Sequence, residues 1–223
     1  MKAEYYIEQL KPIVIKYFDD DRSGHDDEHL TRTMQIALHI CKKEKKGNEV
    51  VVAIAAYLHD VHRLMQTKLK RYVSPLESLP EVEKILENID ISLEMKKQIL
   101  YCIEHHEVYN WNDPENKNRP VEVLIVQDAD NLDALGAVGA SRSICYSHVN
   151  HIPWYDPTIP YNTTSNYAEE NGFGPSSLHH FHHKLFKLGD HMNTKTGTKL
   201  AKQRIKFMKK FEKQLIAEIE GIC

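Results

Sequence analysis

An unbroken apolar segment, residues 50–58, runs directly into the polar pair His59 and Asp60. Wound as a helix, this segment is apolar on every side, which is typical of a helix at the centre of a core. Its β-branched start is compatible with a strand, but its alanines and its length favour a helix. A buried carboxylate costs several kcal/mol unless it is paired or bound to a metal. The sequence therefore predicts a helical core that holds a polar centre.

The remaining periodic segments also have helical spacing. We expect helices at about 4–18, from Asp26 or Asp27 to the stop at Gly47 and Asn48, at 80–88, at 92–106, from Pro120 through the aspartates, at 177–192 and at 198–219. In this interpretation Ser74 and Pro75 belong to a loop, and Pro80 is the first residue of its helix. No segment alternates convincingly like a strand, so the predicted fold class is all-α, with residues 1–223 as a single domain.

Composition excludes several classes of protein. The net charge of −3, from 29 basic and 32 acidic residues, is too small to indicate a nucleic-acid polymer or an anionic membrane as partner. The four cysteines are far apart and form no CxxC pair, so a disulfide framework and a thiolate zinc site are not expected. No apolar run approaches the roughly 20 residues that span a bilayer, and no signal peptide is recognisable. We expect a cytoplasmic protein.

Metal-competent side chains occur on three of the expected core helices. His29 is in register with Thr33 and Ile36 on the inward face of its helix, and Asp130 follows the apolar residues VLIV by a few positions. A single inward histidine is more often a satisfied core residue, and a single buried aspartate is usually a cap or an ion-pair partner. The joint occurrence with His59 and Asp60 favours a common metal site.

Four segments carry a family resemblance: GHDDEHLTRTMQIA, AAYLHDVHR, IEHHE and QDADNLDALGAVGASR. Together they resemble the HD-domain phosphohydrolase superfamily over at least residues 24–145. The later stretch HHKLFKLGDHMNTKTGTKLAKQR resembles the C-terminal part of one branch, small bacterial hydrolases active on nucleoside triphosphates. The resemblance implies an all-α bundle in which His29, His59, Asp60 and Asp130 hold one divalent cation.

Two imidazoles and two carboxylates suit Mn²⁺, Fe²⁺, Ni²⁺, Co²⁺, Zn²⁺ or, less well, Mg²⁺. A cation with open positions can activate water and polarise a phosphoryl oxygen. Some relatives use further histidines for a second metal, but we expect one metal here. His105 or His106 is then a substrate contact or a proton shuttle, with a structural pair at a helix end as the alternative. Asp133 is expected to orient a ligand or water, or to act as a cap.

A site that binds a phosphate substrate needs positively charged side chains. The best candidates for phosphate contacts are Arg142 and Lys184, followed by Arg63. The histidines of residues 179–183 have a spacing that could bind a metal, but they are expected to line a lid or to face solvent. The proline-rich loop 148–176 is the expected lid. A subunit contact by this loop, and hence a homodimer, is the alternative.

The leading hypothesis is a metal-dependent hydrolase of small phosphate esters or anhydrides, with a nucleotide as substrate. Relatives that hydrolyse guanosine tetraphosphate place acidic residues where this chain has Arg63 and Leu64, so that activity is not expected. The alternatives are a phosphodiesterase for cyclic or linear dinucleotides and a non-catalytic sensor of nucleotide or metal.

Overall fold

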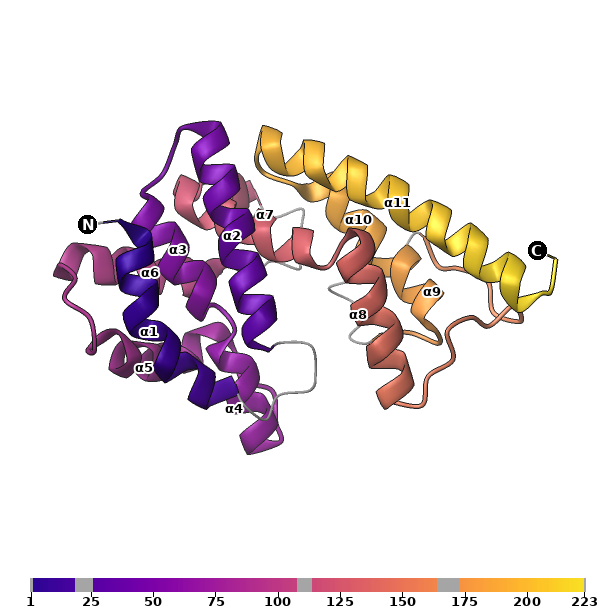
Figure 1. Cartoon of the computed structure of the whole chain (residues 1–223), viewed down its shortest axis with the longest axis horizontal. Coiled ribbons are helices and arrows are strands. Elements are labelled where there is room, and N and C mark those ends of the chain that lie inside the picture. The colour runs from indigo at the N-terminus through magenta and orange to yellow at the C-terminus, as the bar shows by residue number, and fades with distance from the viewer. Residues whose placement is uncertain (1, 19–25, 108–113, 164–172, 223) are drawn as a thin grey trace. The chain divides into compact units, whose positions relative to one another are not determined.

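A computed structural model describes residues 2–18, 26–107, 114–163 and 173–222 (Figure 1). Within these ranges the chain is helical and contains no strand, which confirms the predicted all-α class. The chain divides into two compact units, with the boundary inside one helix, between Asp130 and Asn131. The single-domain organisation stays a prediction, and each unit is described by itself. No described helix is long and apolar enough to cross a membrane.

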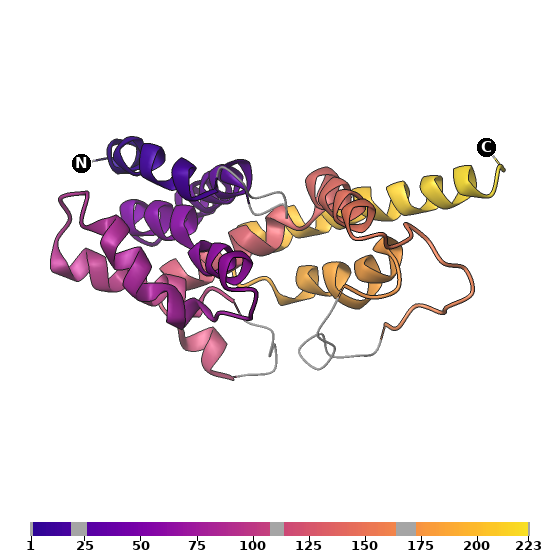
Figure 2. The same ribbon diagram turned by 90° about the horizontal axis from the view of Figure 1, so that it is seen from below.

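The N-terminal unit is built around one short apolar helix. Its helices are α1 (Ala3–Phe18), α2 (Asp27–Glu44), α3 (Glu49–Leu58), α4 (Val61–Leu69), α5 (Pro75–Leu86), α6 (Leu93–His105) and most of α7 (Val121–Asp133), with a 3₁₀ turn at Pro114–Asn118. Every side chain from Val51 to Leu58 is buried, because α1, α2 and α6 all pack against α3 (Figures 1 and 2). The prediction of a central buried helix is confirmed for these residues.

The apolar helix does not continue through the His-Asp pair as the sequence suggested. It ends at Leu58, and α4 begins at Val61, so that His59 and Asp60 form a turn between two helices. Asp60 has backbone angles of −94° and 14°, outside the helical region. This turn lets two consecutive side chains approach one point, whereas neighbours in a continuous helix point about 100° apart.

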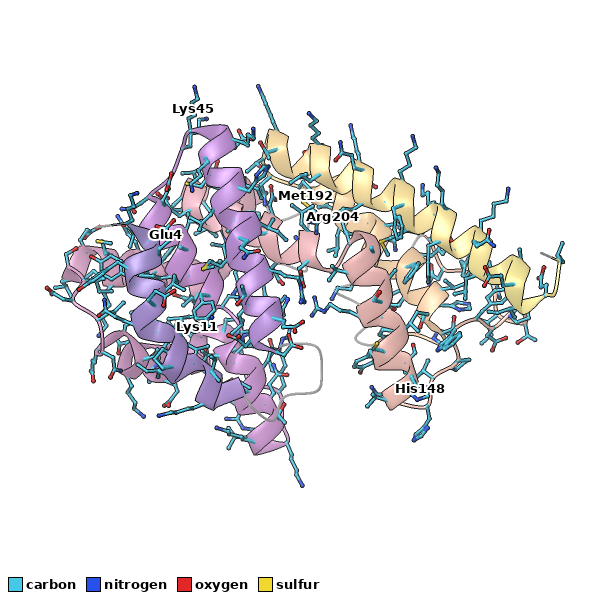
Figure 3. The ribbon with its side chains drawn as sticks, viewed as in Figure 1. Glu4, Lys11, Lys45, His148, Met192 and Arg204 are labelled. Carbon is cyan, nitrogen blue, oxygen red and sulfur yellow. The ribbon has the colours of Figure 1, made fainter. Side chains whose placement is uncertain are left out.

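Two other predicted boundaries were wrong. The second helix ends at Glu44, before the predicted stop at Gly47, and its cap Lys45 adopts the left-handed conformation with φ of 53° (Figure 3). The fifth helix begins at Pro75 instead of Pro80. Ser74 accepts a hydrogen bond from the backbone N–H of Glu77, whose carboxylate accepts one from the backbone N–H of Ser74, and this capping box fixes the start of the helix.

The C-terminal unit contains α8 (Gly136–Val149), which the sequence did not predict, and the 25-residue helix α11 (Lys195–Ile219) that packs against it (Figure 2). Between them, α9 (Ser177–His180), a π-helical turn (Phe181–Leu185), α10 (Phe186–Leu188) and a 3₁₀ turn (Gly189–His191) form one helical run. Gly136 has φ of +79°, and a Cβ atom there would lie 3.0 Å from Cγ of Arg204 (Figure 3). Glycine thus permits both the turn before α8 and the close approach of α11.

Three of the four histidines of residues 179–183 belong to the interior of the C-terminal unit, and for these three the alternative that they face solvent was wrong. His179, His180 and His183 are buried, and the ring of His182 stacks on Tyr161 with 3.9 Å between centroids. A bond between Nε2 of His179 and the carbonyl of Ile159 ties the same loop to α9. The proposed lid stays a prediction, and its residues 164–172 lie outside the described residues.

Candidate metal centre

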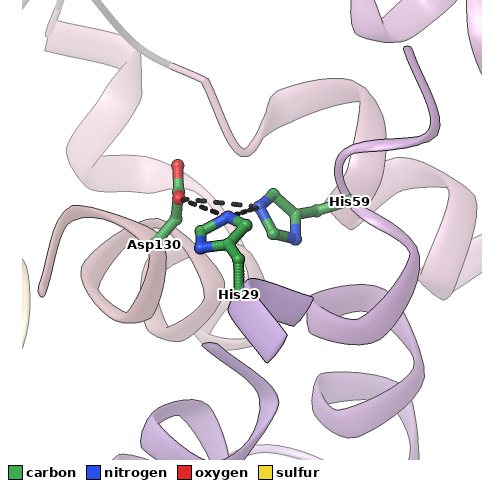
Figure 4. Close-up of side chains that lie close together, drawn as sticks. All are labelled: His29, His59 and Asp130. Atoms are coloured by element: carbon green, nitrogen blue, oxygen red, sulfur yellow. Dashed lines mark hydrogen bonds and ion pairs between the residues drawn. The ribbon is translucent and has the colours of Figure 1, made fainter. Parts of the chain in front are cut away.

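Three elements of the N-terminal unit bring four donor atoms together. α2 supplies His29, the turn after α3 supplies His59 and Asp60, and α7 supplies Asp130. Figure 4 shows three of these side chains, His29, His59 and Asp130. The two Nε2 atoms lie 3.3 Å apart. Oδ2 of Asp60 lies 3.2 Å from Nε2 of His29 and 3.5 Å from Nε2 of His59. Oδ1 of Asp130 lies 3.6 and 3.5 Å from the same two nitrogens.

These spacings fit a common cation. Nitrogen and oxygen ligands lie about 2.0–2.2 Å from a zinc ion. Two such ligands are then about 3.0 Å apart at octahedral angles and about 3.4 Å apart at tetrahedral angles, as simple geometry from those bond lengths requires. The observed separations of 3.2–3.6 Å lie at and slightly above these values. The donor set, two imidazoles and two carboxylates, is one that divalent transition metals accept.

Local contacts orient the imidazoles before any ligand is bound. Nδ1 of His59 lies 2.8 Å from the carbonyl oxygen of Ala56 and donates its proton there, so that Nε2 presents a lone pair to the centre. The backbone N–H of His29 donates to the N-cap carboxylate of Asp26 at 2.8 Å. The cap predicted at Asp26 or Asp27 is therefore Asp26, and it fixes the turn of α2 that carries His29.

The electrostatics of the site favour a positive charge at its centre. Burial lowers the pKa of His59, but the carboxylates of Asp60 and Asp130 outweigh this effect and raise the pKa to about 9. Burial likewise raises the pKa of Asp130, but the hydrogen bond and charge of His59 hold it well below its usual range. Both effects have the same cause, the two carboxylates beside the imidazoles, and these carboxylates would stabilise a cation at the centre.

His106 lies beside this centre, with its ring centroid 5.0 Å from that of His59. Its Nδ1 donates to the carbonyl of Ile103 at 2.6 Å, and burial lowers its pKa to about 3, so its Nε2 is an unprotonated acceptor. The neighbouring His105 lies edge-on to Tyr101 at 4.3 Å instead. His105 and His106, which the sequence analysis considered as one pair, thus have different surroundings, and only His106 lies beside the centre. The catalytic assignment of each stays a prediction.

The candidate phosphate contacts lie in different places. In the N-terminal unit, the guanidinium of Arg63 pairs with Glu107. In the C-terminal unit, Arg142 pairs with the buried carboxylate of Asp133, with 2.8 Å between Nη1 and Oδ2. Lys184 lies in the π-helical turn of the same unit. Their assignments as catalytic or phosphate-binding residues stay predictions.

Sequence reasoning overlooked two residues beside this centre, His62 and Glu107, and a third, Gln127, that contacts the end of α6. His62 and Glu107 lie near His106, and one donor atom of each falls within 4.8 Å of the others. Gln127 donates from Nε2 to the carbonyl of His105 at 2.8 Å and so ties α7 to the end of α6. The spacing of His59 and His62 in LHDVHR was a usable signal, because residues three apart share a face of a helix.

Comparison with known proteins agrees with this geometry. The sequence model described as the HD domain matches residues 26–135, the part of the chain that contains all four donors. The protein YpgQ of Bacillus subtilis is 32% identical over 222 residues, which span 100% of this chain and 98% of YpgQ. The chain belongs to the HD-domain family. It is an HD-superfamily hydrolase.

The fold of this HD-domain chain is shared over its whole length. A protein from Lactobacillus plantarum has a TM-score of 0.75 at 28% identity and covers 99% of this chain and 100% of its own. An HD-superfamily hydrolase from Bacillus thuringiensis has a TM-score of 0.72 at 31% identity, and the match covers 98% of this chain and 99% of that protein. The structure of Bacillus subtilis YpgQ in complex with ADP has a TM-score of 0.70 at 27% identity, and the match covers 100% of this chain and 99% of YpgQ.

Proposed function

We propose that this HD-domain hydrolase is a metal-dependent phosphohydrolase whose single divalent cation is held by His29, His59, Asp60 and Asp130. The observation that carries the proposal is the convergence of four donor atoms from three helical elements, with separations of 3.2–3.6 Å involving the two imidazole nitrogens. When bound, the cation supplies Lewis-acid activation of water and of a phosphoryl oxygen.

The surrounding residues have distinct tasks in this proposal. The backbone oxygen of Ala56 holds the imidazole of His59, and the carboxylate of Asp26 holds the backbone of His29. Asp130 has a side chain that is 30% exposed, whereas both imidazoles are fully buried, so solvent reaches the site beside this carboxylate. His106 offers an unprotonated, buried Nε2 atom that can accept a proton from a water molecule or contact a substrate.

The proposed substrate is a small phosphate ester or anhydride, most specifically a nucleotide such as a nucleoside triphosphate. The support is the ADP complex of YpgQ, which is similar to this chain over its whole length. Arg142, Lys184 and Arg63 are the proposed phosphate contacts, because guanidinium and ammonium groups are the common partners of phosphate oxygens. A cytoplasmic location and a homodimer remain expectations.

The test is a substrate screen with the metal-loaded protein. Nucleoside mono-, di- and triphosphates and dinucleotides are incubated with Mn²⁺, and phosphorus NMR identifies the bond that is cleaved. We expect hydrolysis of a mononucleotide by the natural chain and by Asp90→Asn, which changes an exposed carboxylate, but not by Asp60→Asn. Equal turnover in the Asp60→Asn protein would contradict the proposal. Cleavage of dinucleotides, with no cleavage of mononucleotides, would show that the proposed substrate class is wrong and that the protein is a phosphodiesterase.

A further inference from the structure

A second group of acceptor atoms lies next to the four donors. Nε2 of His62, Nε2 of His106 and a carboxylate oxygen of Glu107 fall within 4.8 Å of one another. Nδ1 of His62 donates to the carbonyl of His59 at 3.1 Å, and Nδ1 of His106 donates to that of Ile103. Both Nε2 atoms are therefore acceptors, and neither has a hydrogen-bond partner among the described residues.

Buried acceptors without a donor require explanation, because such groups are rare in folded proteins. Two imidazole nitrogens and one carboxylate oxygen are also a ligand set that divalent transition metals accept. Taken alone, this group resembles a second cation site. It would adjoin the first site, because His106 also lies within ligand distance of His59 and Asp60, two of the four donors.

Arg63 provides the positive charge that this region already contains. Its Nη2 atom pairs with Oε1 of Glu107, and its Nε lies 3.9 Å from Oδ1 of Asp60. Asp60 turns its other oxygen, Oδ2, towards the imidazoles of the metal centre. The guanidinium thus contacts the one acidic member of the second group and the outer oxygen of a proposed metal ligand.

The charges balance with one cation and not with two. The carboxylates of Asp60, Asp130 and Glu107 carry −3 together, with side chains that are 3%, 30% and 8% exposed. One divalent cation and Arg63 contribute +3 and neutralise them. A second divalent cation would leave +2 uncompensated in a largely buried site, where repulsion between cations is much stronger than in water.

We propose that Arg63 restricts this centre to one divalent cation, and that its removal opens a second cation site at His62, His106 and Glu107. The inference rests on the proposed metal centre. It gives Arg63 a role in setting metal number, beside any contact with phosphate. With an uncharged side chain at position 63, two divalent cations leave only +1, and Glu107 becomes available as a ligand.

The test is the number of Mn²⁺ ions bound, measured by isothermal titration calorimetry and by elemental analysis after gel filtration. Arg63→Met keeps the apolar stem and removes the charge, and Arg63→Gln is a second variant with a polar side chain. The matched control is Arg71→Met, because Arg71 is an exposed arginine that pairs with Glu77. Circular dichroism checks that each variant retains its helices.

We expect about one ion per chain in the natural protein and in Arg71→Met, and about two in Arg63→Met and Arg63→Gln. Adding His62→Ala to Arg63→Met should return the number to about one. One ion in the folded Arg63 variants, or two in the natural protein, would overturn the inference. No ion in the natural protein would instead overturn the proposed metal centre, so the two failures are distinguishable.

Discussion

The Nε2 atoms of His29 and His59 lie 3.3 Å apart, although 30 residues separate them in the sequence. They meet because α2 and α3 pack against each other with these side chains turned inward. With the Nδ1 proton of His59 committed to Ala56, its Nε2 has a lone pair, so the approach of the two nitrogens requires a proton or a cation between them.

Metal removal should abolish hydrolysis. EDTA treatment is expected to reduce turnover to the uncatalysed rate, and excess Mn²⁺ should restore it, because the metal supplies the activation of water. Turnover of the nucleotide found in the substrate screen is measured before chelation, after it and after reconstitution. Full activity in EDTA, with elemental analysis showing no metal, would contradict the account.

Substitutions should differ in severity. Asp60→Ala and Asp130→Ala should cause the largest loss of kcat/KM, because they remove metal ligands. His105→Ala or His106→Ala should follow, and Arg142→Ala and Lys184→Ala should cost about 1.5–3 kcal/mol, or roughly 10- to 100-fold. Steady-state kinetics of the set gives the order. A smaller loss for Asp60→Ala than for Lys184→Ala would contradict it.

Acid should destabilise the metal-free protein between about pH 6.5 and pH 4. Unfolded histidine titrates near 6.5, whereas burial lowers the pKa of His62 to about 4 and that of His106 to about 3. In this range the unfolded chain binds protons that the folded chain does not, so the free energy of unfolding falls as pH falls. The slope is up to about 1.4 kcal/mol per pH unit for each residue. His59 does not change this slope. Its pKa of about 9 lies above that of an unfolded histidine, so it is protonated in both states below pH 6.5 and its contribution to the free energy of unfolding is constant there.

Urea unfolding in EDTA at several pH values measures this slope. His106→Gln should flatten it, because the titrating group is removed. His39→Gln is the matched control, since His39 is exposed on α2 and should leave the slope unchanged. An identical slope in the natural protein and in His106→Gln would show that other groups are responsible.

The pair of Arg142 and Asp133 should contribute to stability. Asp133 is 1% exposed and its Oδ2 atom lies 2.8 Å from Arg142. Arg142→Ala removes a charged partner of a buried carboxylate and should lower the free energy of unfolding by about 1.5–3 kcal/mol. Arg71→Ala, which breaks an exposed pair, should cost less than about 1 kcal/mol. Equal losses in urea unfolding would contradict this role.

The cap of α2 should couple stability to metal affinity. Asp26→Ala removes the hydrogen bond to the backbone of His29 and should cost about 1 kcal/mol. Ser74→Ala removes the corresponding bond at α5, which carries no donor of the centre, and should cost a similar amount. Only Asp26→Ala should also weaken Mn²⁺ binding in calorimetry. Equal metal affinity in both variants would show that the cap acts on stability alone.

The sequence predicted the helices with the clearest periodicity, such as α1 and α11, and the buried character of residues 51–58. It missed α8, whose sequence GAVGASRSICYSHV has two glycines and no clear apolar stripe. The break at His59 and Asp60 was not predictable from local propensity, because the segment is a good helix on both sides of it.

Residue pairs that join distant elements could likewise not be predicted from local sequence patterns. Glu107 meets Arg63 across 44 positions, and this contact depends on where the end of α6 lies in the packed unit. The four donors, in contrast, were predicted from joint occurrence and family resemblance, and the structure places their donor atoms together. Their role as metal ligands is the claim that remains for measurement.

An anomalous difference map from a crystal of the Mn²⁺-loaded protein tests that claim most directly. The account predicts a single strong peak at about 2.0–2.3 Å from Nε2 of His29, Nε2 of His59, Oδ2 of Asp60 and Oδ1 of Asp130. A fully loaded crystal with no peak among these four atoms, or with its strongest peak at other residues, would contradict it.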